Sequence, residues 1–146
     1  MTRRPYLALF AVLAPLSLCL ACDARADAPP APAHKSINDG SRGARIYMQS
    51  CASCHQADGS GVPNLQPSLI GDPVIGEESP KTLIEVILKG PAAVLPPNRP
   101  HYGNLMTPFD SLSDREVASL VTFLRKAFGK PGAAVKAADV AAERGS

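Results

Sequence analysis

Residues 51–61, CASCHQADGSG, constrain this chain more than any other stretch. Two cysteines lie three residues apart, and a histidine directly follows the second one. Three kinds of site use a C-x-x-C pattern: a redox-active dithiol, a zinc site and a covalently attached haem. Any fold built on this sequence must present these three side chains together and complete the site from elsewhere in the chain.

The haem interpretation accounts for all three residues. A dithiol motif gives the histidine no required place and belongs to a βαβ context that this sequence does not show. Zinc needs four ligands, and the remaining histidines, His34 and His101, lie at distant and irregular positions. In C-x-x-C-H two thioether bonds hold the haem, and the adjacent imidazole lies under the iron. The motif therefore predicts one covalent haem c on Cys51 and Cys54, with His55 as an iron ligand.

Residues 1–26 have the features of a secretory signal peptide. Arg3 and Arg4 precede an apolar run over residues 6–20, and a small-x-small pattern predicts cleavage after Ala26. One alternative is a retained N-terminal anchor. Another is lipoprotein cleavage before Cys22, which would tether the protein to a membrane through that cysteine. Either way, we expect an exported protein that works in the periplasm.

The apparent positive charge of the chain belongs to this leader. The chain has 15 Lys and Arg against 13 Asp and Glu, and cleavage after Ala26 removes three arginines and one aspartate, which leaves 12 of each. Nucleic-acid binding needs a basic patch, so we expect no nucleic-acid partner. A near-neutral charge also gives little electrostatic steering and favours an apolar or mixed docking surface for protein partners.

The mature sequence divides into three parts. Residues 27–39 form a Pro/Ala-rich linker, residues 40–130 a single domain, and residues 131–146 a C-terminal tail. The tail is expected to form a short, weak helix from about residue 135 or to stay loose.

Capping and periodicity signals predict three main helices in the domain. The first begins at a cap, Asn38 or Ser41, and runs to about residue 50. The second begins near Ser79 and ends at Gly90. The third begins at a capping box, Ser113 with Glu116, and stops at Gly129. No strand pattern is evident, so the expected class is all-α, with three to four helices joined by long loops.

The sixth iron ligand is expected in the second long loop. Met1 lies in the leader, and Met48 lies too close to Cys51 to reach the opposite face of a haem. Met106, in the irregular stretch before the last helix, remains, and Met/His ligation of haem is common. His101, five residues upstream, is the competing ligand.

Further side chains are predicted around the haem. The His55 ring N–H needs an acceptor, which a backbone carbonyl at the rigid Pro67 would provide, with Leu69 placed to touch the haem ring. Arg99 and Tyr102, with His101, are candidates to bind the haem propionates. The candidates for the apolar wall of the pocket are Tyr47, Leu65, Leu69, Ile70, Leu83, Ile87, Phe109, Leu120 and Leu124.

From about residue 40 to residue 129 the chain resembles a class I c-type cytochrome. The resemblance rests on GARIYMQSCASCHQADGSGV, PSL, MTPF and the final helix, and is most similar to the cytochrome c domains of alcohol and gluconate dehydrogenase cytochrome subunits. It implies the cytochrome c fold, Pro67 as the acceptor for His55, and a crossing of the first and last helices at Gly43 and Tyr47. Two features depart from those subunits: they usually carry three haem motifs and a membrane anchor, and Thr107 stands where Pro is usual.

The resemblance also implies a function. We expect a periplasmic monohaem cytochrome that carries single electrons from a dehydrogenase to a terminal oxidase or another cytochrome, rather than an enzyme. The twin-arginine start of the leader does not fit, because that route exports folded proteins and family members receive haem unfolded, after export. The alternatives are a haem enzyme or ligand-binding sensor with an open or labile sixth position, and a thiol–disulfide protein without haem.

Overall fold

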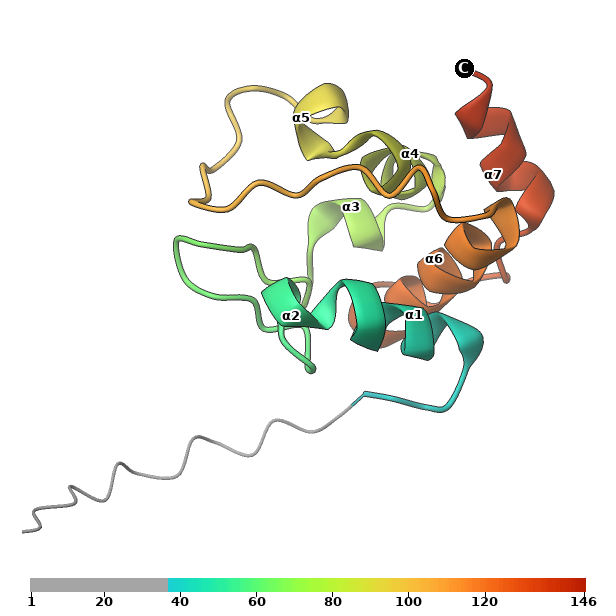
Figure 1. The fold of residues 1–146 in the computed structure, drawn as a ribbon, viewed down its shortest axis with the longest axis horizontal. Coiled ribbons are helices and arrows are strands. Elements are labelled where there is room, and N and C mark those ends of the chain that lie inside the picture. Colours follow the sequence, from blue (N-terminus) through green and yellow to red (C-terminus); the bar gives the residue numbers. More distant parts are fainter. Residues whose placement is uncertain (1–36) are drawn as a thin grey trace, which may run out of the picture. The chain divides into compact units, whose positions relative to one another are not determined.

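The computed structural model describes residues 37–146, so the predicted signal peptide and most of the linker lie outside the described residues. The named elements of this part of the chain are all helices, and long loops join them (Figure 1). Its elements are α1 (Arg42–Ser50), α2 (Ala52–His55), α3 (Pro73–Gly76), α4 (Lys81–Lys89), α5 (Pro91–Val94), α6 (Asp114–Phe128) and α7 (Ala137–Arg144). The three main predicted helices are α1, α4 and α6, and the all-α class is confirmed.

Helices α1 and α6 cross in close contact, at the position expected for Gly43 and Tyr47. A Cβ atom on Gly43 would lie 2.1 Å from the Ser119 carbonyl oxygen and 2.6 Å from the Phe123 Cβ, so only glycine fits there. The fully buried Tyr47 ring packs against Phe123 and Phe128, with ring centroids 5.6 and 5.5 Å apart. This crossing forms the centre of the apolar core.

The helix ends follow the local capping chemistry. Ser41 caps α1, because its Oγ accepts a hydrogen bond from the Ala44 backbone N–H at 3.1 Å. At the start of α6 the Ser113 backbone N–H donates to Glu116 Oε2 at 2.9 Å, as the capping box predicts. The hydrogen bond from the Ser113 hydroxyl, followed by that backbone bond and the neighbouring Arg42, lowers the pKa of Glu116 to about 2.

Two short helices interrupt the stretches that we expected to be irregular. Asp72 caps α3 by accepting from the Val74 and Ile75 backbone N–H groups at 2.9 and 3.3 Å, with Pro73 at the first helical position. Pro91 begins α5 in the same way, directly after Gly90. The expectation of continuous loop was therefore wrong at these two places, where proline begins a single turn.

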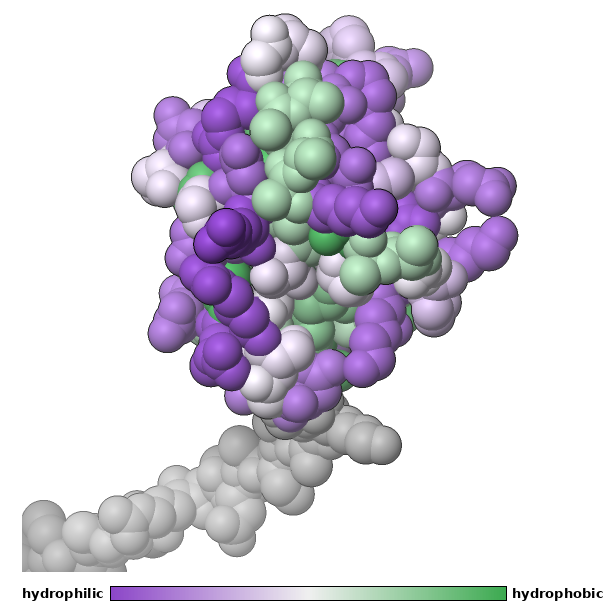
Figure 2. Space-filling model, turned by 90° about the vertical axis from the view of Figure 1, so that its right-hand side faces the viewer, coloured by the Kyte–Doolittle hydropathy of each residue, from purple (hydrophilic) through white to green (hydrophobic). Residues whose placement is uncertain are grey.

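The C-terminal tail forms a packed helix, α7, so the loose alternative is wrong. Val140 is fully buried where α7 packs on α6 and α4, and Glu143 forms an ion pair with Lys81 of α4 (Figure 1). Figure 2 shows a strip of weakly hydrophobic residues between hydrophilic ones on this side of the domain. Alanine makes up most of the exposed face of α7. The buried Val140 and the charged side chains therefore attach this helix to α4 and α6.

Two of the residues expected in the apolar wall are not part of the core. Ile70 is 60% exposed and Leu65 is 44% exposed, whereas Leu83, Ile87, Leu120 and Leu124 are buried. The Leu69 backbone N–H bonds to the Gly59 carbonyl, and Leu69 packs against the core. No helix among residues 37–146 has both the length and the apolar character to cross a membrane.

Candidate functional site

A single turn of helix presents the C-x-x-C-H residues. Cys51 ends α1 and begins α2, and its carbonyl accepts hydrogen bonds from the Cys54 and His55 backbone N–H groups at 3.1 and 2.9 Å. Cys51 is half-buried, Cys54 is exposed, and both are free thiols. The motif therefore offers two thiols and one imidazole from the same rigid turn.

The loop after α2 fixes the His55 ring. His55 Nδ1 lies 3.0 Å from the Pro67 carbonyl oxygen, the acceptor expected from the sequence, and this bond leaves Nε2 free to face a metal. The same loop returns to α2 through a bond from the Gly61 N–H to the His55 carbonyl at 3.0 Å. Gly61 has a φ of +68°, and a Cβ atom there would lie 2.5 Å from the Pro67 oxygen. Only glycine allows the loop to close on the histidine at this point.

The Cys51 thiol is poorly suited to thiol–disulfide exchange. Burial, followed by the nearby Cys54, raises the pKa of Cys51 to about 12. The thiolate is the reactive form, and redox-active cysteines have lowered pKa values. At neutral pH this sulfur is protonated, so the arrangement argues against the dithiol interpretation.

Met106 lies in a segment that is tied to the core. Its side chain is partly buried and packs against the core cluster. Three residues later the Phe109 backbone N–H donates to the Ile87 carbonyl at 2.8 Å, which fixes the segment to α4. At Gly90, which ends α4, a Cβ atom would approach the Met106 carbonyl oxygen to 3.3 Å. The fold thus holds the segment of Met106 against α4.

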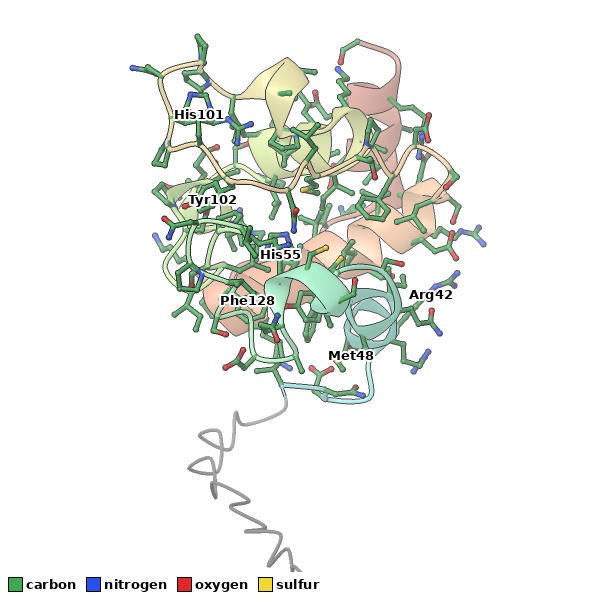
Figure 3. The ribbon with its side chains drawn as sticks, turned by 60° about the vertical axis from the view of Figure 1, so that its left-hand side comes forward. Arg42, Met48, His55, His101, Tyr102 and Phe128 are labelled. Atoms are coloured by element: carbon green, nitrogen blue, oxygen red, sulfur yellow. The ribbon has the colours of Figure 1, made fainter. Side chains whose placement is uncertain are left out.

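The other two candidate ligands are placed differently. Figure 3 shows Met48 on the side of α1 away from the His55 ring, and its side chain is 37% exposed. His101 is exposed and lies near the top of the loop that precedes Met106 (Figure 3). Neither side chain packs against the core cluster as Met106 does.

The remaining predicted site residues fall into two groups. Leu69 and Phe109 are partly buried and pack against the core, while Arg99 and Tyr102 are half-buried in the loop before Met106. The Tyr47 hydroxyl donates to the Gln56 carbonyl at 2.6 Å, and its ring packs on α6. Tyr47 therefore supports the segment after His55 from the helix crossing, and its predicted contact with a haem stays a prediction.

Two features of the site were not predicted from the sequence. The loops around Leu65 and Gly103 are joined by two backbone bonds, from the Gly103 N–H to the Asn64 carbonyl at 2.8 Å and from the Asn104 N–H to the Leu65 carbonyl at 3.1 Å. Long-range pairing between irregular segments leaves no periodic signal. The second feature is Gln66, next to Pro67, whose Oε1 is buried without a hydrogen-bond partner among the described residues.

These observations fit a site that another group completes. The oriented His55 and the two thiols on the same turn, with the anchored Met106 segment, would suit the donor set of a covalent haem. The residues present therefore fit a haem c.

Comparison with known proteins supports the same assignment. The Cytochrome c family profile matches residues 40–128. The chain is 38% identical over 105 residues to the cytochrome c subunit of alcohol dehydrogenase (quinone) from Gluconobacter oxydans, a match that covers 69% of this chain and 21% of that protein. It is 35% identical over 118 residues to the gluconate 2-dehydrogenase cytochrome c subunit of Pantoea cypripedii, covering 73% and 25% of the two chains.

A smaller relative is similar over a larger share of its own length. Cytochrome c-552 of Thermus thermophilus is 34% identical over 90 residues, 60% of this chain and 68% of that protein. By contrast, the chain spans only about a fifth to a quarter of the dehydrogenase subunits that it matches. The chain belongs to the cytochrome c family, the all-α haem proteins of electron transport, and its cofactor is a covalently bound haem c.

Proposed function

We propose that this protein is an exported monohaem electron carrier in which Cys51 and Cys54 hold the haem and His55 and Met106 ligate the iron. The observation that carries the proposal is the 3.0 Å contact between His55 Nδ1 and the Pro67 carbonyl oxygen. This bond fixes the ring orientation and directs Nε2 away from the loop, as an axial ligand requires.

The residues of the chain would tune the one-electron couple that the haem supplies when bound. A thioether ligand from Met106 favours Fe(II) and raises the reduction potential relative to a second histidine. Apolar side chains at Leu69 and Phe109 act in the same direction, because they disfavour the extra positive charge of the ferric state. Arg99 and Tyr102 are the candidates to pair with the propionates.

The proposed donor is a dehydrogenase, and the proposed acceptor is a terminal oxidase or another cytochrome. Two of the relatives described above are named as cytochrome c subunits of alcohol and gluconate dehydrogenases. The two loops at residues 62–71 and 91–109 contain one charged residue, Arg99. Such a surface favours a brief, largely apolar encounter over electrostatic steering. The leader supports a periplasmic location, with lipidation of Cys22 as the alternative that would add a membrane tether.

Optical spectra of protein exported with haem-attachment machinery test the proposal. The weak far-red band of the oxidised protein reports a bond between methionine sulfur and Fe(III). We expect this band in the unaltered protein and in Met48→Ala, and its loss in Met106→Ala. If the band is absent, the assignment of Met106 is wrong, and an open site or ligation by His101 takes its place. If the band survives in Met106→Ala, the assignment is wrong as well, and another methionine, Met48, ligates the iron.

A further inference from the structure

The last turn of α7 contacts the segment that carries Met106. Arg144 Nη1 donates to the Asp110 carbonyl at 2.8 Å and Nη2 to the Leu112 carbonyl at 2.6 Å, while Nε pairs with the Asp114 carboxylate at 2.9 Å. One guanidinium thus binds three groups within five residues. Its planar fork suits this geometry, which a lysine ammonium does not reproduce.

The same segment is fixed at its other end by α4. The Phe109 N–H bonds to the Ile87 carbonyl at 2.8 Å, and Gly90 lies against the Met106 backbone. Residues 106–114, which we call the methionine segment, are therefore held between α4 on one side and Arg144 on the other. A displacement of the backbone that carries Met106 would strain these attachments.

Helix α7 is a firm support for this arginine. Val140 is fully buried against the core, Glu143 pairs with Lys81 of α4, and the Val135 N–H donates to Thr122 Oγ1 of α6 at 2.9 Å. Figure 1 shows α7 alongside α6 and α4, next to the segment that leads into α6. The match to the cytochrome c family ends at residue 128, so α7 lies outside the matched domain.

We infer that Arg144 is a positioning residue for the sixth ligand: by clamping the methionine segment from α7, it opposes displacement of Met106 from the iron. The inference rests on the proposed ligation by Met106. The hydrogen bonds of the Arg144 side chain go to Asp110, Leu112 and Asp114, and none goes to residues 106–109. Arg144 acts through the backbone at Asp110 and Leu112.

Imidazole, which competes with a thioether for Fe(III), is the probe. The dissociation constant of imidazole is measured on the full-length oxidised holoprotein from the change in the main haem absorption band, which can be followed in Met106→Ala as well. In Arg144→Gln we expect imidazole to bind about tenfold more tightly, equivalent to about 1.4 kcal/mol. The effect is modest because the Arg144 side chain is 35% exposed. In Arg144→Lys, which keeps the charge but loses the fork, we expect an intermediate gain.

Arg115→Gln is the matched control. Arg115 is exposed on α6, and its side chain makes no hydrogen bond or ion pair with any residue of the described part. Arg115→Gln removes one positive charge, as Arg144→Gln does. We expect its imidazole affinity to equal that of the unaltered protein. Urea unfolding of all variants shows whether a change in affinity exceeds any change in global stability. If Arg144→Gln and Arg115→Gln bind imidazole with equal affinity, the clamp is refuted.

The two possible failures are separable. If Met106→Ala binds imidazole no more tightly than the unaltered protein does, the ligation by Met106 is wrong and the clamp has nothing to position. If Met106→Ala binds imidazole far more tightly while both Arg144 variants match the unaltered protein, ligation stands and the clamp alone is refuted.

Discussion

The substitution Gly43→Ala tests the closest contact between the first and last helices. A Cβ atom at residue 43 would lie 2.1 Å from the Ser119 carbonyl oxygen and 2.6 Å from the Phe123 Cβ. Both obstacles belong to the α6 backbone or are attached to it, so no side-chain rotation relieves them. The two helices would have to separate by about 1 Å to restore ordinary contact, in a core that is packed at crystal-like density.

The cost follows from two opposing effects. Overpacking of a well-packed core costs about 3 kcal/mol at the upper end of its usual range. Alanine is a better helix former than glycine, and this difference offsets up to about 1 kcal/mol of the overpacking cost. We therefore expect Gly43→Ala to lower the free energy of unfolding by about 2 kcal/mol.

Urea unfolding of the holoprotein, followed by far-UV circular dichroism, measures this difference. Gly76→Ala in α3 is the control, because nothing lies within 4 Å of a Cβ atom at that position and its φ is not positive. We expect the control to be neutral or slightly stabilising. Equal unfolding free energies for Gly43→Ala and the unaltered protein would refute the close helix crossing.

Three further substitutions probe the loop, the cap and the buried tyrosine. Gly61→Ala should destabilise by about 2 kcal/mol more than Gly40→Ala in urea unfolding, because both have positive φ but only residue 61 would collide with the Pro67 oxygen; equal costs would refute the collision. The pKa of Glu116 is held at about 2, below its ordinary 4.5, so its ionised form stabilises the fold above about pH 5 and this contribution is lost as the pH falls toward 2. Glu116→Gln should therefore give a shallower loss of stability on acidification, and an unchanged slope would contradict the lowered pKa. Tyr47→Phe removes the donor to the Gln56 carbonyl and should cost about 1 kcal/mol in unfolding free energy with the haem spectrum unchanged, whereas an altered spectrum would mean that the hydroxyl acts on the haem directly.

The parts of the fold with local chemical signals were predictable from the sequence. Ser41 and the Ser113–Glu116 pair mark helix starts because their side chains bond the nearby free N–H groups. The C-x-x-C-H turn is local as well, and the resemblance to a known family supplied Pro67 as the acceptor for His55. Each of these features depends on residues close in sequence or on a motif that a whole family shares.

The remaining features depend on tertiary contacts. The tail was expected to form a short, weak helix or to stay loose, and the buried Val140 together with the Glu143–Lys81 ion pair packs it on the domain. Arg125 is buried and donates to the Glu77 and Glu78 carbonyls at 2.7 and 3.0 Å, a role that no sequence pattern announces. The clamp of Arg144 on residues some 30 positions earlier is of the same kind.

Carbon monoxide binding to the reduced protein tests the central claim most directly. An electron carrier whose iron is closed by His55 and Met106 has no free coordination position, whereas a haem enzyme or a ligand-binding sensor has one. The account predicts that carbon monoxide leaves the spectrum of the reduced, unaltered protein unchanged and shifts that of Met106→Ala. Prompt binding of carbon monoxide to the unaltered protein would contradict it.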